Sequence, residues 1–289
     1  MKRLIVTADD FGAAVAVNEA VEQAHGDGIL TCASLLVAGD AAADAVARAM
    51  RMPGLGVGLH LVLVEGRPVL PSDRIPDLID ADGLFRTDMV RAGINFFFRP
   101  SVRRQLAAEI EAQFAAFAAT GLALDHVNAH KHFHLHPTIT SLILEIGERH
   151  GIRAVRAPVE PRAVLNAIDR PQGIDIALPW ARLVRLRLRK AGLAVPDQVF
   201  GIAWSGALHR DRLRGLLARL PDGLTEIYTH PAMAAYPGSA LGYRYQDELA
   251  ALTDDLAKDI IKREMITLGR FVDFAELARH ASRQPLGRL

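Results

Sequence analysis

The sequence predicts an α/β fold in the form of one (β/α) barrel, related to the TIM barrel and irregular in places. Short apolar runs alternate with Ala-rich helical stretches along the 289 residues, which indicates a mainly parallel sheet. Polar residues suited to chemistry follow several of the apolar runs, and barrels build their sites at the carboxyl ends of strands. Half of the residues are hydrophobic, so we expect a single domain over residues 1–289.

The individual elements follow from the apolar runs and from helical spacing. Leu106, Ile110 and Phe114, for example, recur at the interval of one helix face. Two Pro-containing stretches, residues 65–99 and 158–200, interrupt the alternation and are interpreted as inserts. Strands are expected at residues 4–8, 33–37, 55–64, 124–129, 152–157, 226–229 and 265–271. Helices are expected at residues 14–25, 41–50, 102–119, 139–150, 213–220 and 247–262.

Composition excludes several classes of protein. Lys plus Arg total 34 and Asp plus Glu 33, and this near-neutral balance argues against a nucleic-acid partner. Cys32 is the only cysteine, which excludes an internal disulfide and a Cys-rich zinc site, and its apolar neighbours predict a small buried residue. The N-terminus enters a strand-like run without a long apolar leader, so we expect a cytoplasmic protein.

The first candidate site residues are two adjacent acids, Asp9 and Asp10, directly after the first apolar strand. Burying carboxylates near a strand end is costly unless they are paired or bind a cation. The alternative is that one of them caps the helix that follows, by accepting hydrogen bonds from its first backbone amides. A cap explains one aspartate well and two less well, so the pair favours a cation site.

The second group of candidates is histidines. His60 ends a strand-like run between glycines, although a histidine in that position is by itself more often part of the core. The run from His130 to His136 alternates His with other residues, so these imidazoles share a face if the strand continues. If a helical turn begins there, His130 and His134 share a face instead. A solvated loop is the remaining alternative, but His-rich tracts are typical of metal sites.

One aspartate with two histidines leaves open positions on a bound ion, which suits hydrolysis by an activated water. The same ligand set serves non-haem iron oxygenases, but these usually have β-folds. His230 ends another strand before Pro231, where it can act as a general acid or base, or can simply occupy a turn.

These motifs together resemble the YdjC-like carbohydrate deacetylases, over about residues 2 to 275. A closer resemblance is to the hopanoid-biosynthesis subgroup, through residues 7–12, 61–68 and 128–137. The residues that carry the family resemblance are Ala8-Asp9-Asp10-Phe11-Gly12, Gly58-Leu59-His60, His126-Val127-Asn128-Ala129-His130 with His134, and Thr229-His230-Pro231.

The resemblance implies a barrel-like fold and removal of an N-acetyl group from an amino sugar, which in the subgroup is N-acetylglucosamine on a bacteriohopanetetrol lipid. It implies one divalent ion, Mg²⁺ or Zn²⁺, held by Asp10, His60 and a third ligand that is His130 or His134. It also implies that Asp9 is the general base. His230 or His134 would then protonate the leaving amine.

Arg156 ends another predicted strand, where it can orient Asp9 or contact substrate, or can be a plain surface arginine. Competing functions are a metal-dependent phosphoesterase or amidohydrolase acting on a soluble substrate, and a non-enzymatic sugar- or metal-binding module. A carboxylate beside a three-ligand site argues for chemistry, because binding alone needs no base. As a partner we expect an amino sugar or glycolipid, and a homodimer is left open.

A last feature concerns lipid. Residues 176–196 contain arginines beside Trp180 and several leucines, at a spacing that fits a strand or a helix face. Phe96-Phe97-Phe98 followed by Arg99, Arg103 and Arg104 forms a second such run. Both can pack on the barrel with their arginines solvated. The alternative is peripheral contact with the inner membrane, at a surface that admits a lipid tail.

Overall fold

The strands form one parallel sheet that curls into a barrel. The computed structural model describes residues 1–172 and 177–275, so the expected domain 1–289, the insert 158–200 and the segment 176–196 each include residues outside that part. Within the described residues the strand order is β4-β3-β2-β1-β6-β5, with β7 also paired to β1, and each of these pairings is parallel. The strands are β1 (Lys2–Phe11), β2 (Cys32–Leu35), β3 (Gly56–Leu61), β4 (Val127–Ala129), β5 (Gln198–Phe200), β6 (Gly223–Thr229) and β7 (Thr267–Leu268).

The barrel closes irregularly between β4 and β5. Val127 of β4 forms an isolated parallel bridge with Val155, and Ala154 forms another with Ala194. The Val199 amide of β5 then donates to the Val159 carbonyl, at 2.9 Å. Residues 152–157, which were expected to form a strand, therefore lie between β4 and β5 in the barrel and pair there through isolated bridges. This confirms the predicted α/β barrel and its irregularity.

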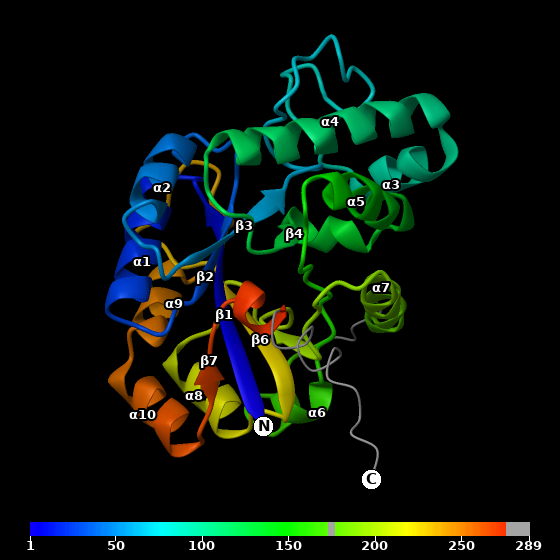
Figure 1. The fold of residues 1–289 in the computed structure, drawn as a ribbon. Coiled ribbons are helices and arrows are strands. Elements are labelled where there is room, and N and C mark those ends of the chain that lie inside the picture. Colours follow the sequence, from blue (N-terminus) through cyan, green and yellow to red (C-terminus); the bar gives the residue numbers. More distant parts are fainter. Residues whose placement is uncertain (173–176, 276–289) are drawn as a thin grey trace.

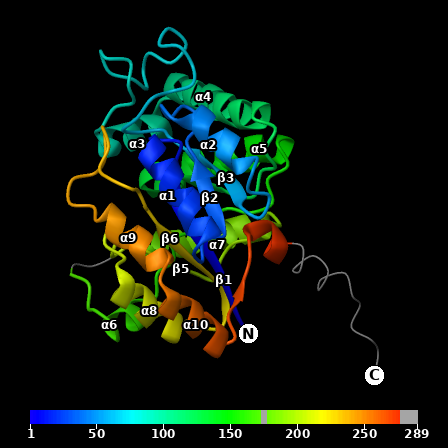
Figure 2. The same cartoon turned by 90° about the vertical axis from the view of Figure 1, so that its left-hand side faces the viewer.

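Helices cover the outside of the sheet (Figure 1). Figure 2 views the molecule from the side covered by α1, α2, α9 and α10. On another side α4 packs against α3 and α5, and α5 also contacts α7. The helices are α1 (Val15–Gly26), α2 (Ala42–Ala49), α3 (Met89–Phe98), α4 (Pro100–Ala119), α5 (Pro137–Arg149), α6 (Arg162–Asn166), α7 (Leu178–Lys190), α8 (Arg210–Ala218), α9 (Tyr245–Leu252) and α10 (Asp255–Arg263), with a 3-10 segment, η1 (His130–Leu135).

The strands read as apolar runs because both of their faces are buried, as expected in a parallel sheet. β2 and β3 are buried along their whole length, and Cys32 is buried as predicted. The inner face nevertheless carries polar side chains, among them Ser34, Asn128 and Glu226, which are completely buried. Buried polar groups need partners, and here those partners form the site described below.

Several expected elements differ from the structure. The expected helix at residues 247–262 is two helices, because Asp254 caps a new start by accepting a hydrogen bond from the Ala257 amide. The expected strand at 265–271 is limited to β7, because residues 271–275 are already helical. α3 and β5 were missed within the stretches interpreted as inserts. The ambiguous segment around Arg185 is the helix α7.

Candidate metal centre and active site

A cavity of about 860 Å³ opens at the carboxyl ends of β1, β3 and β6 and at the start of η1. Its floor contains the predicted Asp9, Asp10, His60, His130 and His230. A tyrosine-rich wall completes it on the side of β6 and of the segment before α9. The tyrosines are Tyr228, Tyr236, Tyr243 and Tyr245.

A break in β1 brings the two adjacent aspartates to the same cavity. Successive side chains of a regular strand point to opposite faces, which would send one of the two carboxylates away from the barrel interior. Between Ala8 and Phe11 the register of β1 against β2 shifts, and Asp10 has the left-handed φ of 63°. Such a conformation is costly for a residue with a side chain and is found mainly at functional sites. It allows Asp9 and Asp10 both to line the cavity.

The capping alternative for these acids does not hold. α1 begins after Ala14, and no side chain caps it. The two aspartates instead have partners on other strands and segments, described next.

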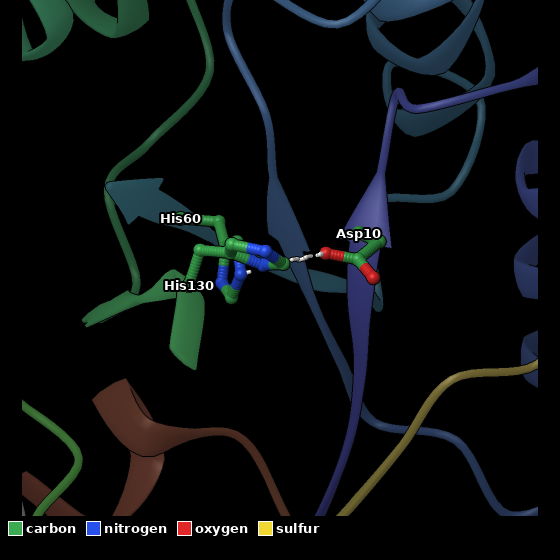
Figure 3. A group of neighbouring side chains, drawn as sticks. All are labelled: Asp10, His60 and His130. Atoms are coloured by element: carbon green, nitrogen blue, oxygen red, sulfur yellow. Dashed lines mark ion pairs between the residues drawn. The ribbon is translucent and has the colours of Figure 1, made fainter. Parts of the chain in front are cut away.

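Asp10, His60 and His130 converge from three elements (Figure 3). His60 Nε2 lies 3.5 Å and His130 Nδ1 3.7 Å from the same Asp10 oxygen, Oδ1. One ligand atom from each residue lies within 4.8 Å of the others. Two imidazoles and one carboxylate converging in this way are a donor set that fits a divalent cation with open positions left over.

The charges of this group favour a cation as well. Burial would raise the pKa of Asp10, but the neighbouring His130 outweighs it and lowers the pKa below its ordinary value. Burial lowers the pKa of His60, so its ring tends to be neutral and to offer a lone pair. Burial would also lower the pKa of His130, but Asp10 beside it raises that pKa. A cation that replaces this proton keeps the Asp10 charge balanced.

Asp9 is held on a different set of partners. Arg156 Nη1 donates to Asp9 Oδ2 at 2.6 Å and Nη2 to Oδ1 at 3.0 Å. Arg156 also donates to Glu226 Oε1, and its guanidinium lies over the Tyr228 ring, 4.5 Å from the centroid. Burial would raise the pKa of Asp9, but Arg156 and His60 hold it well below its ordinary range. Asp9 is therefore an oriented, ionised carboxylate beside the three converging residues.

Arg156 itself was predicted as a residue that orients Asp9 or contacts substrate. Its side chain is completely buried and is not among the residues that line the cavity. Its bidentate contact with Asp9 favours the orienting role.

The histidine tract neither continues as a strand nor forms a regular helix. Lys131 and His132 both have left-handed φ angles, 55° and 53°, inside η1. This turn places His132 at the cavity wall, where its Nε2 lies 3.0 Å from the Tyr228 hydroxyl. His134 is buried behind it and does not line the cavity, and burial with the Arg156 charge lowers its pKa to about 3.

His230 lies at the cavity, after the end of β6. Its backbone amide donates to Glu248, and its ring meets the Tyr228 and Tyr243 rings at centroid distances of 5.6 and 5.2 Å. Its Nδ1 is buried and has no hydrogen-bond partner among the residues that the structure describes. The ring is thus held among aromatic groups with a nitrogen that the fold does not use.

Several contributors were not found in the sequence. Tyr236, Tyr243 and Tyr245 were overlooked. His132 was noted only within the histidine tract, Glu226 and Tyr228 only within the strand before His230, and Asn128 only as part of a motif. Asn128 carried the clearest signal, since it lies two residues before His130 and shares its strand face. The tyrosines come from β6 and from residues 236–245, and nothing in their spacing ties them to the histidines.

Comparison with known proteins places this chain in a family. The model of the family described as YdjC-like protein matches residues 3–263. The chain is 30% identical to a carbohydrate deacetylase of Brevibacillus brevis, over 95% of this chain and 99% of the relative. It is 31% identical to a carbohydrate deacetylase of Geobacillus stearothermophilus, over 92% and 97% of the two chains.

One solved structure has the same fold. It is a protein from Enterococcus faecalis V583, described as a candidate cellobiose-phosphate cleavage protein, and it superposes with a TM-score of 0.76 at 24% identity. The match covers 94% of this chain and 98% of that one.

Proposed function

This chain belongs to the YdjC-like protein family, and we propose that it is a metal-dependent N-deacetylase that hydrolyses the acetamide of an N-acetylglucosamine-type sugar. The relatives named as carbohydrate deacetylases support the reaction class. The observation that carries the proposal is the pairing of two different carboxylates on one cavity floor. Asp10 converges with His60 and His130, while Asp9 beside it is held by Arg156.

We assign Asp10, His60 and His130 as the ligands of one divalent ion. A bound ion would polarise the acetamide carbonyl and make a water more acidic. His130 is favoured over His134 as third ligand because His130 faces Asp10 at the cavity floor and His134 lies behind the wall. The two imidazoles suit Zn²⁺, and Mg²⁺ is the alternative that the family resemblance implies.

Asp9 is the proposed general base. Its carboxylate is ionised and lies at the cavity floor, so it can accept a proton from the attacking water. Arg156 keeps both oxygens of Asp9 in place, so the base is oriented before substrate arrives.

His230 is the proposed general acid toward the leaving amine. Its ring lines the cavity, between the Tyr228 and Tyr243 rings. His134 is less suited, because a group with a pKa of about 3 holds no proton to donate at neutral pH. The tyrosine-rich wall beside His230 offers faces on which an apolar sugar face can stack.

For the substrate we propose a glycolipid, N-acetylglucosamine on bacteriohopanetetrol, rather than a soluble amino sugar or chitooligosaccharide. Support beyond the subgroup resemblance comes from two helices that both pack against α5 on the right-hand side of Figure 1. They expose an unusual number of large apolar side chains, and such patches are typical of interaction surfaces. The exposed residues are Val90, Ile94, Phe97 and Phe98 on α3, and Trp180, Leu183 and Leu186 on α7. We call this set the α3–α7 surface.

Only some of the aromatic and arginine side chains in these two segments are available for the proposed membrane contact. Phe96 is buried against Phe133, so Phe97 and Phe98 alone of this run are exposed. Arg187 and Arg189 donate to Ser141 and Asp197 within the chain. No helix among the described residues is long and apolar enough to span a bilayer. The proposal is therefore peripheral contact with an anionic membrane, made by apolar side chains with arginines at their border.

An assay of acetate release distinguishes the candidate substrates. The enzyme is offered the N-acetylglucosaminyl hopanoid and, separately, a soluble chitooligosaccharide, with the Asp9→Asn variant as control for each. Faster release from the glycolipid supports the proposal. Release from the oligosaccharide alone would contradict the lipid part, and release from neither would contradict the deacetylase itself.

A further inference from the structure

A chain of buried polar side chains runs from His60 down into the barrel, away from the cavity. His60 Nδ1 lies 2.6 Å from Asn128 Oδ1, and Asn128 Nδ2 lies 2.8 Å from Ser34 Oγ. Ser34 Oγ lies 3.0 Å from His126 Nε2, and His126 Nδ1 lies 2.9 Å from Asp125 Oδ2. Ser34, His126 and Asp125 do not line the cavity, and neither the ligand set nor the proton transfers proposed above use them.

The direction of each hydrogen bond at the lower end follows from counting donors. Asp125 accepts at both carboxylate oxygens, since Oδ1 receives the Val272 amide at 3.0 Å and Oδ2 the Cys32 thiol at 3.4 Å. His126 therefore donates from Nδ1, and its Nε2 accepts the hydroxyl proton of Ser34. Were Nε2 protonated instead, the Ser34 hydroxyl would have no acceptor among the bonds that the structure shows. Ser34 thus presents only a lone pair toward Asn128.

Counting donors in the same way fixes the directions of the hydrogen bonds at the upper end of the chain, at Asn128 and His60. The two N–H groups of Asn128 point to Ser34 Oγ and to Asp9 Oδ1, the latter at 3.0 Å. Its carbonyl oxygen then faces His60 and accepts from Nδ1–H. In the tautomer that donates from Nδ1, the lone pair of the His60 ring is on Nε2, and that nitrogen faces Asp10 at 3.5 Å.

Two other functions for this cluster fit less well. Asp125, His126 and Ser34 have the hydrogen bonds of a hydrolytic triad, but Ser34 is completely buried and no substrate reaches it. Cys32, Asp125 and His126 also offer ligand atoms within 4.8 Å of one another. Each of these is already hydrogen bonded, and the buried Phe271 ring stacks on His126 with the ring centroids 4.3 Å apart.

We infer that Asp125, His126 and Ser34 are positioning residues, which act together with the Asp9 carboxylate to fix the orientation of the Asn128 amide and thereby the His60 tautomer that carries a free Nε2. The inference rests on the proposed function, in which that nitrogen is a metal ligand. Groups that hydrogen bond to a ligating imidazole set its tautomer and orientation. Here the chain from Asp125 to the His60 ring consists of four hydrogen bonds.

The test compares Ser34→Ala with Cys32→Ala. Both substitutions remove one heavy atom from the same buried face of β2, and Cys32 touches Asp125 without belonging to the chain that reaches His60. Ser34→Thr keeps the hydroxyl and serves as the conservative rescue. The first readout is the ¹⁵N NMR signals of the His60 ring in metal-free protein, assigned with His60→Gln. The second is the affinity for Zn²⁺ by calorimetry.

In the wild type we expect His60 to be protonated at Nδ1 and bare at Nε2. Ser34→Ala should mix the tautomers and weaken Zn²⁺ binding by about tenfold, the lower end of the usual effect of such partners. Cys32→Ala and Ser34→Thr should match the wild type in both readouts. A wild-type His60 protonated at Nε2 would overturn the inference without any variant, and so would a Ser34→Ala protein that matches Cys32→Ala.

The proposed positioning chain and the proposed metal centre can fail separately. If Ser34→Ala shifts the tautomer while Zn²⁺ and Mg²⁺ bind to neither protein, the positioning chain stands and the proposed metal centre falls. If Zn²⁺ binds but the tautomer and affinity are insensitive to Ser34, the metal centre stands and the positioning chain falls.

Discussion

Arg156 donates to both carboxylate oxygens of Asp9 and leaves the adjacent Asp10 free to face His60 and His130. Two identical side chains, next to each other in the sequence, thereby acquire different surroundings. One is locked against a buried cation of the protein, and the other faces two imidazoles. This separation is the physical basis for assigning one carboxylate to proton transfer and the other to the metal ion.

Removing a proposed ligand should remove the ion. Asp10→Ala and His60→Ala should each lose metal and activity together, because two remaining donors do not hold a divalent cation firmly. Metal analysis of the purified variants, alongside turnover, checks this. His150→Ala is the matched control, since that ring binds Glu111 away from the cavity. A ligand variant with full metal content and normal turnover would take that residue out of the site.

Asp9→Asn should separate binding from chemistry. The amide keeps the shape of the side chain but cannot accept the proton, so turnover should fall by about 10²–10⁴-fold while metal content stays. Metal analysis and acetate release on one preparation give both values. The roles of the two aspartates would have to be exchanged if Asp9→Asn lost the metal and Asp10→Asn kept it.

Substitution of Arg156 should affect stability and catalysis differently according to the replacement. Arg156→Met leaves Asp9 and Glu226 buried without their cation, at a cost of about 3–5 kcal/mol in the free energy of unfolding. Arg156→Lys keeps the charge but loses the bidentate grip, so kcat should fall more than KM changes. Urea unfolding and steady-state kinetics test the pair. If the two variants lost the same amount of stability and of kcat, this would argue against a positioning role for Arg156.

The buried Asp125 should make stability depend on acid. Burial would raise its pKa, but the hydrogen bonds from His126 and the Val272 amide outweigh this and lower it below the ordinary 3.8. A carboxyl group whose pKa is lower in the folded than in the unfolded protein stabilises the fold. That contribution is complete at pH values above the unfolded-state pKa, and it is lost as the pH falls through the folded-state pKa. The wild type should therefore exceed Asp125→Asn in stability at pH 7, by a margin that shrinks below about pH 4. Urea unfolding at several pH values measures it, and a margin independent of pH would refute the assignment.

The α3–α7 surface should bind anionic lipid. Phe97→Ser with Phe98→Ser, and Leu183→Ser with Leu186→Ser, remove exposed apolar groups without opening the core. Both double variants should co-sediment less with phosphatidylserine-containing vesicles, and raising the salt concentration should weaken binding by the wild type. Retention of binding by both variants, or no binding by the wild type, would leave these side chains without a lipid role. Activity on a soluble substrate is the control for folding.

The sequence could predict the fold class and the residues that end strands, because these depend on local patterns. Asp9, Asp10 and His60 follow apolar runs, and the carboxyl ends of parallel strands meet at one rim. The left-handed backbone at Asp10, Lys131 and His132 could not be predicted, since residues with a side chain adopt it rarely and no local pattern marks it.

The contact of Arg156 with Asp9 was foreseen as one alternative, but the second partner of Arg156 was not predicted. Arg156 and Glu226 form a buried ion pair across 70 residues, and nothing local marks either as buried. The split between α9 and α10 was readable in principle, because Asp254 is a good N-terminal cap three residues before Ala257.

The most direct test of the account is acetate release from the N-acetylglucosaminyl substrate by protein treated with a chelator and then supplied with Zn²⁺ or Mg²⁺. We predict no turnover by the chelator-treated protein and recovery of turnover when Zn²⁺ or Mg²⁺ is added. Asp9→Asn should not recover under the same conditions. Full turnover by the metal-free protein, or recovery of Asp9→Asn to the wild-type rate, would contradict it.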